Sequence, residues 1–251
     1  MKTTACAIAV ALVLLAVPLD ARNGCRPLFN GKTLDGWYAC NGTAPFTVED
    51  GAIVGRTVVA SPNSFLCSND SFGDFILEYE VWVNTNLNSG MQVRSIADPA
   101  IKKGRVHGTQ IEIDPSDRAW SGGIYDEARR GWLHTLVGRD TARRAFRMGQ
   151  WNTFRVEAIG TSIRTWLNGV PCANIVDDLT PSGVLAMQVH SIGSDASRAG
   201  DVIKFRNIRI LTTDPAARAT PDKGETPQFN YIPNTLTPRE SKDFGNGVGS
   251  N

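Results

Sequence analysis

Residues 107–116 read HGTQIEIDPS, and polar and apolar side chains alternate along them. Gln110, Glu112 and Asp114 are separated by single isoleucines, which is the two-residue period of a β-strand with one polar face. Ordinary exposed strands carry Thr, Lys and Ser, whereas this one carries amide and carboxylate groups. The segment therefore predicts a strand that presents a polar surface to a ligand, and a solvated outer face is the alternative.

Two other segments show the same alternation. Gln92 and Arg94 alternate with apolar residues in the first, and Gln188 and His190 do so in the second. If all three segments pair in one sheet, their polar faces form one floor and their apolar faces form one wall of a core. The predicted floor consists of Gln92, Arg94, Gln110, Glu112, Asp114, Gln188 and His190, and the predicted core includes Ile111, Ile113, Leu185, Met187 and Val189.

Short strand patterns separated by turn residues recur through most of the chain. The predicted strands are Phe46–Glu49, Ala52–Arg56, Phe75–Val83, Gly90–Arg94, Thr109–Ile113, Trp151–Ala158, Ser162–Leu167, Gly183–His190 and Ile203–Leu211. Asn168-Gly169 is a strong hairpin signal, and it predicts that residues 170–173 fold back against residues 163–167. Many short strands with no convincing amphipathic helix predict an all-β fold, a two-sheet antiparallel sandwich of the jelly-roll kind.

The chain divides into three parts by composition. Residues 1–21 have a positively charged start, an apolar run and a small residue at the end. This pattern predicts a secretory signal peptide and export to the periplasm or the extracellular space, because the run is too short to span a bilayer. Residues 22–212 hold the strand patterns and predict one domain, and residues 213–251 are rich in Pro, Gly and Asn, which predicts an irregular tail. A lipoprotein anchored at Cys25 is the minor alternative, since no apolar residue of a lipobox precedes it.

Charge and cysteine content limit the classes of partner. The net charge is +1, from 26 Lys and Arg against 25 Asp and Glu, and the absence of a basic stripe argues against nucleic acid. Four cysteines follow the predicted signal peptide, which predicts one or two disulfides in an exported protein. Three pairings of Cys25, Cys40, Cys67 and Cys172 stay open, their spacing does not resemble a zinc site, and nothing in the sequence sets the oligomeric state.

A charged and aromatic loop, residues 120–132, follows the strand that carries Glu112. Its glycines allow the backbone to approach a ligand closely, and its aromatic side chains offer stacking surfaces for a sugar. Tyr125, Glu127 and Arg130 are the residues of this loop that we expect at the rim of a ligand site. A salt-bridged surface turn is the alternative.

A series of short motifs runs through residues 27–212 in a fixed order. The motifs are LFNGKTLDGW (28–37), VEDG (48–51), GDF (73–75), NSG (88–90), GTQIE (108–112), GIYDE (123–127), WN (151–152), WLNG (166–169) and FRNIR (205–209). Together they resemble the 3-keto-disaccharide hydrolase family, which is similar to the concanavalin A-like glucanases. The resemblance implies a two-sheet jelly roll with a sugar cleft on its concave sheet.

The resemblance also implies an activity. Members of such a family would act on a small oxidised glycoside or oligosaccharide, by elimination across C1–C2 of a 3-keto-glucoside and rehydration of the keto-glucal, which amounts to hydrolysis. Gln110, Glu112, Tyr125, Glu127 and His190 fall on motif positions associated with the cleft.

The residues of the polar floor suit this chemistry. A ketone at C3 acidifies the C2 proton, so that a carboxylate or an imidazole can remove it. Glu112 and His190 are the preferred proton-transfer groups, and Glu127 is the reserve. The enolate needs positive charge, for which Arg94, Arg130 and a bound divalent cation are the candidates. The predicted substrate-binding residues are Gln92, Arg94, Gln110, Asp114, Tyr125, Arg130 and Gln188.

Two other functions stay open, a conventional β-glucanase-like hydrolase and a non-catalytic carbohydrate-binding module. Glu112 and Asp114 have the spacing of a carboxylate pair on one strand face, as a retaining glycosidase requires. However, Asp117 stands where the glucanase string E-x-D-x-x-E has its last Glu. Asp114 precedes Pro115, and its alternative role is to hold the end of the strand.

Overall fold

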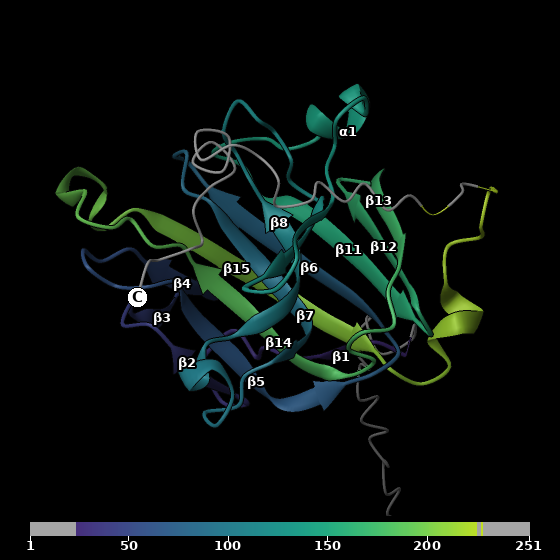
Figure 1. Cartoon of the computed structure of the whole chain (residues 1–251), viewed down its shortest axis with the longest axis horizontal. Helices are drawn as coiled ribbons and strands as arrows, with labels where there is room; N and C mark the ends of the chain where they lie inside the picture. Colours follow the sequence, from purple (N-terminus) through teal and green to yellow (C-terminus); the bar gives the residue numbers. More distant parts are fainter. Residues whose placement is uncertain (1–23, 225–226, 228–251) are drawn as a thin grey trace, which may run out of the picture.

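Strict alternation of buried and outward side chains builds the sheets of this protein. In β6 (Phe75–Val83), every second side chain is buried, whereas Glu78 and Glu80 are only half-buried. The structure, a computed structural model, describes residues 24–224 and 227. Its strands form two antiparallel sheets stacked as a sandwich (Figure 1), which confirms the predicted fold class.

In each sheet, one of the two edge strands comes from the N-terminal part of the chain. The eight-stranded sheet has the order β13 (Val170–Val176), β12 (Ser162–Leu167), β11 (Asn152–Ile159), β6 (Phe75–Val83), β15 (Val202–Leu211), β4 (Ala52–Arg56) and β3 (Phe46–Glu49), and β1 (Arg26–Pro27) pairs with β15. The seven-stranded sheet has the order β10 (Gly131–His134), β9 (Ile124–Glu127), β8 (His107–Ile113), β7 (Ser89–Ile96), β14 (Gly183–Val189), β5 (Ser64–Phe72) and β2 (Trp37–Asn41). Helical structure in the described residues is limited to α1 (Asp140–Arg143) and the 3-10 turns η2 (Lys102–Gly104), η3 (Ala196–Arg198) and η4 (Pro215–Arg218).

The core lies between the two sheets, as the alternation of apolar residues predicted. The five predicted core residues, Ile111, Ile113, Leu185, Met187 and Val189, are at most 1% exposed and belong to one apolar cluster. At about 25 cal/mol per Å² of buried apolar surface, a core of this kind supplies most of the folding free energy. The predicted hairpin is confirmed too, with Asn168 at φ 49° and Gly169 at φ 80° between β12 and β13.

One disulfide ties two strands of the seven-stranded sheet. Cys40 of the edge strand β2 is bonded to Cys67 of β5, and their Cα atoms are 5.8 Å apart. The sequence leaves three pairings open, and the structure selects this one because strand pairing brings the two residues together. Cys172 is buried in the core on β13.

Two predicted segments fall largely outside the described residues. Residues 1–21, the predicted signal peptide, are not described, and of the predicted tail only residues 213–224 and 227 are. In that described part, η4 is followed by Thr220, whose hydroxyl donates to Glu157 of β11 at 2.7 Å. No helix within residues 24–224 is long and apolar enough to cross a membrane.

Candidate functional site

The outer face of the seven-stranded sheet, which points away from the core, carries a row of polar and aromatic side chains. Strand register places Gln92 opposite Gln110, Gln110 opposite Tyr125, and Tyr125 opposite Trp132. Residues directly opposite each other in antiparallel strands share a face, so this row crosses β7, β8, β9 and β10. Glu127, two residues beyond Tyr125, lies on the same face. We call this surface the outer site.

Glu112 is the buried carboxylate at the centre of the outer site. It is 3% exposed, and its two oxygens accept hydrogen bonds from the Asn88 and Gln110 side-chain amides at 2.5 and 2.9 Å. The guanidinium of Arg118 lies 3.8 Å from one carboxylate oxygen. Burial raises the pKa of Glu112 to about 7, against the lowering effect of Arg118. Near neutral pH, Glu112 therefore exists in both protonation states.

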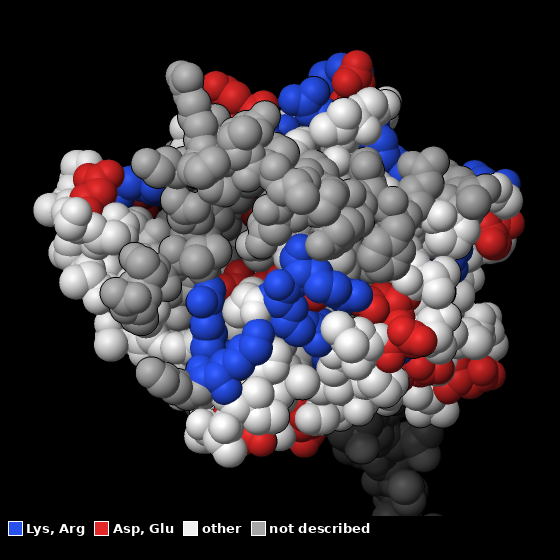
Figure 2. Space-filling view, viewed as in Figure 1, with Lys and Arg blue, Asp and Glu red and all other residues white. Residues whose placement is uncertain are grey.

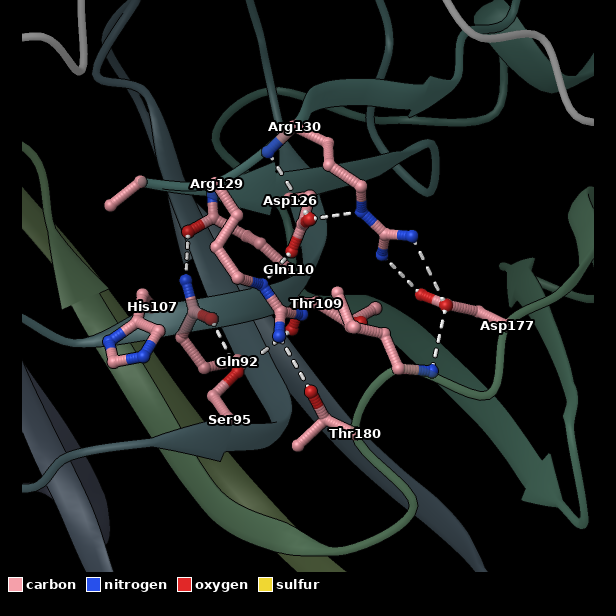
Figure 3. A network of polar contacts seen from close by, with 12 residues as sticks. Gln92, Ser95, His107, Thr109, Gln110, Asp126, Arg129, Arg130, Asp177 and Thr180 are labelled. Carbon is pink, nitrogen blue, oxygen red and sulfur yellow. Dashed lines mark hydrogen bonds and ion pairs between the residues drawn. The ribbon is translucent and has the colours of Figure 1, made fainter.

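A chain of buried side chains continues from Glu112 along the sheet, and Figure 3 shows its members Gln110, Gln92 and Ser95. The Gln92 amide donates to the carbonyl oxygen of Gln110 at 2.7 Å, and the Ser95 hydroxyl donates to the carbonyl oxygen of Gln92 at 2.7 Å. All of these residues are at most 3% exposed. Gln92 and Gln110 thus lie on the outer face as predicted, and Ser95 was not expected there.

Gly90 makes room for the Gln110 side chain. A Cβ atom at Gly90 would lie 2.3 Å from Cδ of Gln110. We expect Gly90→Ala to push Gln110 away from Glu112 and to lower the free energy of unfolding by about 1–3 kcal/mol. Chemical denaturation measures this loss of stability. Gly73→Ala is the matched control, since its nearest neighbour, an oxygen of Pro181, is 3.8 Å away, and equal stability of the two variants would contradict the expectation.

Gln188 carries a buried side-chain amide on the same sheet. It is fully buried, and neither its Oε1 nor its Nε2 has a hydrogen-bond partner among the described residues. It lies two residues from Ala186, which pairs with Gln92, so it shares the outer face. A buried amide without partners costs free energy unless a ligand or water satisfies it.

His190 follows the last residue of β14 and is half-buried. Its Nδ1 lies 2.7 Å from the carbonyl oxygen of Ser191, so in the neutral ring Nδ1 carries the hydrogen and Nε2 is the base. Burial, and then the positive charges of Arg198 and Arg118, lower its pKa. Because Arg118 acts on both Glu112 and His190, the two proton-transfer candidates lie around one arginine.

Glu127 is a second buried carboxylate of the outer site. It accepts from Arg105 at 3.1 Å and from Asn63 at 3.4 Å. The Asn63 carbonyl oxygen in turn accepts from the backbone N–H of Ser191, so Asn63 connects Glu127 to the segment that carries His190. Burial raises the pKa of Glu127, partly offset by Arg105.

Tyr125 lies between these carboxylates. It is half-buried and packs edge-to-face against Trp132. Burial raises its pKa, and the negative charges of Glu127 and Glu112 raise it further. This shared electrostatic influence is consistent with the predicted grouping of Tyr125, Glu127 and Glu112 on one surface.

Arg94 does not belong to the polar floor, and the prediction that placed it there is wrong. The register of β7 against β8 shifts between Val93 and Ile96, and Arg94 adopts φ 47°. Such a bulge breaks the two-residue period, so the side chain turns to the other face.

The guanidinium of Arg94 instead joins turns at one end of the sandwich. It is 1% exposed and donates to the backbone carbonyls of Gly73 and Gly160 at 2.8 and 2.7 Å, and to the Asp74 carboxylate at 3.0 Å. Gly160 lies between β11 and β12, so Arg94 connects the two sheets.

Asp114 holds the end of β8. Its side chain accepts from Ser116 at 2.6 Å and from Arg118 at 2.6 Å, and it is 2% exposed. Of its two predicted roles, these contacts fit the one at the strand end. They also position Arg118, whose guanidinium lies 5.0 Å from the ring centres of both Trp120 and Trp132.

Arg130 is held by carboxylates outside the outer site (Figure 3). Asp126, opposite Thr109 and fully buried, binds both Arg129 and Arg130, and Asp177 binds Arg130 at 2.5 Å. Two carboxylates thus neutralise the guanidinium that was predicted to face an enolate. Through these contacts, Arg130 joins the β9–β10 hairpin to the loop before β14. The prediction that Arg130 contacts substrate is therefore corrected.

The carboxylates of the outer site are not arranged for a metal ion. Glu112, Asp114 and Glu127 each accept from an amide, a hydroxyl or a guanidinium, which occupies the oxygens that a divalent cation would need. Within residues 24–224 and 227, no three His, Cys, Asp or Glu side chains are grouped for metal binding. The donor set does not fit the divalent cation that was predicted as a candidate to stabilise the enolate.

Positive charge is nevertheless close to the outer site. Figure 2 shows Lys and Arg side chains gathered around the position of β7, with Asp and Glu beside them. Arg105 and Arg118 are the arginines that contact the buried carboxylates. Neither they nor Asn63, Asn88 and Ser95 were predicted as site residues. Of these, only Asn88 had a signal, since it opens the motif NSG.

Comparison with known proteins places this site in a family. Residues 24–211 match the family described as the 3-keto-alpha-glucoside-1,2-lyase-like domain. No curated protein sequence matches the chain.

Solved structures share the fold at low sequence identity. A protein of Parabacteroides distasonis ATCC 8503 described as a glycosyl hydrolase is 19% identical, with a TM-score of 0.56 over 79% of this chain and 98% of that chain. Another structure of a glycosyl hydrolase so described, from the same organism, is 19% identical, with a TM-score of 0.52 over 74% and 98%. A Bacillus subtilis protein with a galectin-like fold is 10% identical, with a TM-score of 0.56 over 75% and 94%. These likenesses confirm the concanavalin A-like sandwich.

Proposed function

The chain belongs to the family of 3-keto-alpha-glucoside-1,2-lyase-like domains, and we propose that it is an exported enzyme that cleaves 3-keto-glycosides by elimination across C1–C2, followed by hydration. The observation that carries this proposal is the pair formed by Glu112 and His190. Burial raises the pKa of Glu112 to about 7 and lowers that of His190, so that near neutral pH Glu112 can give or take a proton while the His190 ring is neutral and can act as a base. The positive charge of Arg118 acts on both groups. Titratable pairs of this kind are typical of acid–base sites.

The first half of the reaction is a β-elimination. His190, neutral at pH 7 with Nε2 as its base, takes the C2 proton that the C3 ketone has acidified. The electron pair moves to the enolate, the bond from C1 to the glycosidic oxygen breaks, and protonated Glu112 gives its proton to that oxygen. The products are the free alcohol and a 3-keto-2-hydroxy-glucal.

The second half runs the same groups in reverse. Water adds to C1, with the ionised Glu112 taking its proton, and His190 returns a proton to C2. Arg118 supplies positive charge for the enolate in both halves, in place of the predicted Arg94 and Arg130. A group that must exchange protons in both directions needs a pKa near the working pH, as burial provides for Glu112.

The polar row of the outer site supports binding of a polyhydroxylated ligand. Gln188 has an unsatisfied buried amide, Tyr125 offers part of an aromatic ring, and Glu127 holds Arg105 and Asn63 beside them. Buried polar groups that lack protein partners gain most from a hydrogen-bonding ligand. Gln92, by contrast, already has partners at both ends of its amide, so it acts through Gln110.

Export is the part of the proposal that rests on residues 1–21 together with the disulfide. Disulfides persist in oxidising compartments, and the bond between Cys40 and Cys67 fits a protein that works outside the cytoplasm. The substrate would then be a glycoside already oxidised at C3 by another enzyme.

Isotope labelling tests the reaction. We expect the purified protein, incubated in D₂O with 3-keto-trehalose, 3-keto-maltose or 3-keto-cellobiose, to release 3-keto-glucose that carries deuterium at C2. The parent sugars, which lack the ketone, should not react. Mass spectrometry at early times reads the label before free enolisation of the product adds it.

Each other outcome selects a different function. Turnover without deuterium at C2 would indicate direct hydrolysis, as in a conventional glycosidase. Binding of the keto-sugars by calorimetry without any turnover would indicate a carbohydrate-binding module.

A further inference from the structure

The buried chain that runs from Glu112 to Ser95 has one direction of donation. The Ser95 hydroxyl donates to Gln92, the Gln92 amide donates to Gln110, and the Gln110 amide donates to Oε2 of Glu112. This direction ends in an oxygen that accepts only, so it satisfies the ionised carboxylate.

The same heavy-atom positions also support the opposite direction. When Oε2 of Glu112 carries a proton, it must donate, and the Gln110 amide can accept only after its oxygen and nitrogen exchange places. Gln110 then donates to Gln92, whose amide turns over in the same way and donates to the Ser95 oxygen. Each side-chain amide has an acceptor at one end and a donor at the other, so no contact of the chain is lost in the reversal.

Ser95 is the residue that allows the chain to end in both directions. Besides Gln92 at 2.7 Å, its hydroxyl lies 3.1 Å from the backbone carbonyl of Val93 and 3.3 Å from that of Thr109. In the reversed chain, the Ser95 oxygen accepts from Gln92 and its hydrogen moves to one of these carbonyls. A hydroxyl both donates and accepts, and no other side chain of this size does so.

Close packing keeps water from replacing any member of this chain. Ser95, Gln92 and Gln110 are 1%, 0% and 2% exposed. A Cβ atom at Gly108 would lie 2.5 Å from the Ser95 hydroxyl oxygen, and one at Gly90 would meet Gln110. The partners of a buried amide are therefore side chains of the protein.

We propose that Ser95, Gln92 and Gln110 form a reversible hydrogen-bond chain that turns over whenever Glu112 gains or loses its proton, and that Ser95 and Gln92 are positioning residues for this carboxyl group. The assignment of a catalytic proton to Glu112 rests on the proposed function. The chain itself rests only on the contacts described above.

Other charged groups around Glu112 act in parallel with the chain. Arg118 and Asp114 come from the end of β8 and the loop after it, and Tyr125 lies on β9. His190 follows β14 and also lies near Arg118. None of these groups contacts Ser95 by a hydrogen bond in the structure, so a change at Ser95 reaches Glu112 through the two glutamines.

Replacement of Ser95 tests the chain. In Ser95→Ala, only the backbone carbonyl oxygens of Val93 and Thr109 remain at the Ser95 end of the chain. Because these oxygens accept hydrogen bonds, they favour the reversed chain, in which the NH₂ group of Gln92 faces them. The reversed chain is the one that stabilises protonated Glu112. We expect the pKa of Glu112 to rise by about half a unit to one unit, the equivalent of one buried hydrogen bond. The measurement is ¹³C NMR of protein labelled at the glutamate carboxyl carbons, in which Glu112→Gln identifies the signal by its loss.

Two controls make the result specific. Ser89→Ala removes another fully buried hydroxyl of β7, which donates to the backbone carbonyl of Gln188 at 2.6 Å, and it should leave the titration of Glu112 unchanged. Gln92→Met breaks the chain in the middle, so Ser95→Ala added to it should cause no further change, whereas independent effects would add. Ser95→Cys, with a weaker donor, should fall between wild type and Ser95→Ala if the full truncation does not fold.

The kinetic measurement separates this inference from the proposed function. If 3-keto-trehalose is turned over, the limb of the pH profile of kcat/KM that belongs to Glu112 should move upward by the same amount in Ser95→Ala. If no keto-glycoside is turned over, the proposed function fails, and the NMR titration still decides about the chain. A titration of Glu112 that is the same in wild type, Ser95→Ala and Ser89→Ala would overturn the chain.

Discussion

Replacement of Glu112 by Gln should abolish nearly all turnover while the protein stays folded and still binds sugar. The new amide has almost the shape of the carboxyl group. Its oxygen can accept from the Asn88 amide, and its NH₂ group can donate to Gln110 once the glutamine chain reverses, as it does for protonated Glu112. It cannot exchange a proton, and general acid–base catalysis typically contributes 10²–10⁴-fold in rate. We therefore expect kcat for 3-keto-trehalose to fall by about that factor, with the dissociation constant from calorimetry unchanged.

The same substitution should raise stability at high pH. Burial gives Glu112 a pKa of about 7 in the folded state, against its ordinary value of 4.5 in an unfolded chain, so ionisation disfavours the folded protein as pH rises through this window. Below pH 4.5 the carboxyl group is protonated in both states and contributes no difference. Above pH 7, Glu112→Gln should exceed wild type by up to about 3 kcal/mol in the free energy of unfolding, since one pKa unit equals about 1.36 kcal/mol.

Glu157→Gln is the matched control for both effects. Glu157 is equally buried, but it lies on the eight-stranded sheet and binds Arg155 and Arg164 at 2.8 and 2.6 Å. Glu157→Gln should preserve kcat and lower the free energy of unfolding, whereas Glu112→Gln should lower kcat and raise the free energy of unfolding above pH 7. Unchanged kcat in Glu112→Gln would remove Glu112 from the reaction.

The second large effect concerns stability and not catalysis. Arg94→Met should lower the free energy of unfolding by about 2–4 kcal/mol, because it leaves the backbone carbonyls of Gly73 and Gly160 without their donors. Thermal or denaturant unfolding measures the loss. The folded fraction should retain the KM of wild type, since the guanidinium points away from the outer site.

Arg56→Met provides the comparison for Arg94. Arg56 forms an ion pair with Glu49 in which both side chains are more than a third exposed, and such surface pairs contribute about 0–1 kcal/mol. If Arg94→Met raised KM and left the unfolding transition in place, Arg94 would be a substrate contact after all.

The fold and part of the site could be predicted from the sequence for one physical reason. Within an uninterrupted strand, side chains alternate between the two faces of the sheet. The apolar residues could therefore be assigned to the core, and Gln92, Gln110 and Glu112 could be assigned together to the outer face. Arg94 escaped this rule because a bulge adds a residue to one strand only, and alternation carries no signal for it.

The partners of these residues could not be predicted. Asn63, Arg105 and Arg118 lie on loops, and which loop approaches which strand depends on packing between segments far apart in the chain. The disulfide pairing stayed open in the sequence for the same reason, because Cys40 and Cys67 meet through the pairing of β2 with β5. The sequence around Arg130 likewise does not indicate that Asp126 and Asp177 neutralise its guanidinium, because Asp177 comes from a distant segment.

The disulfide at the margin of the seven-stranded sheet has a consequence for the lifetime of the protein. Among the described strands, β2 is hydrogen-bonded on one side only. A strand in that position is where a sheet begins to fray and where its unpaired backbone can recruit a second chain. The covalent link to β5 keeps β2 in register even when its hydrogen bonds open. Reducing agents would therefore act first as a cause of aggregation at this strand.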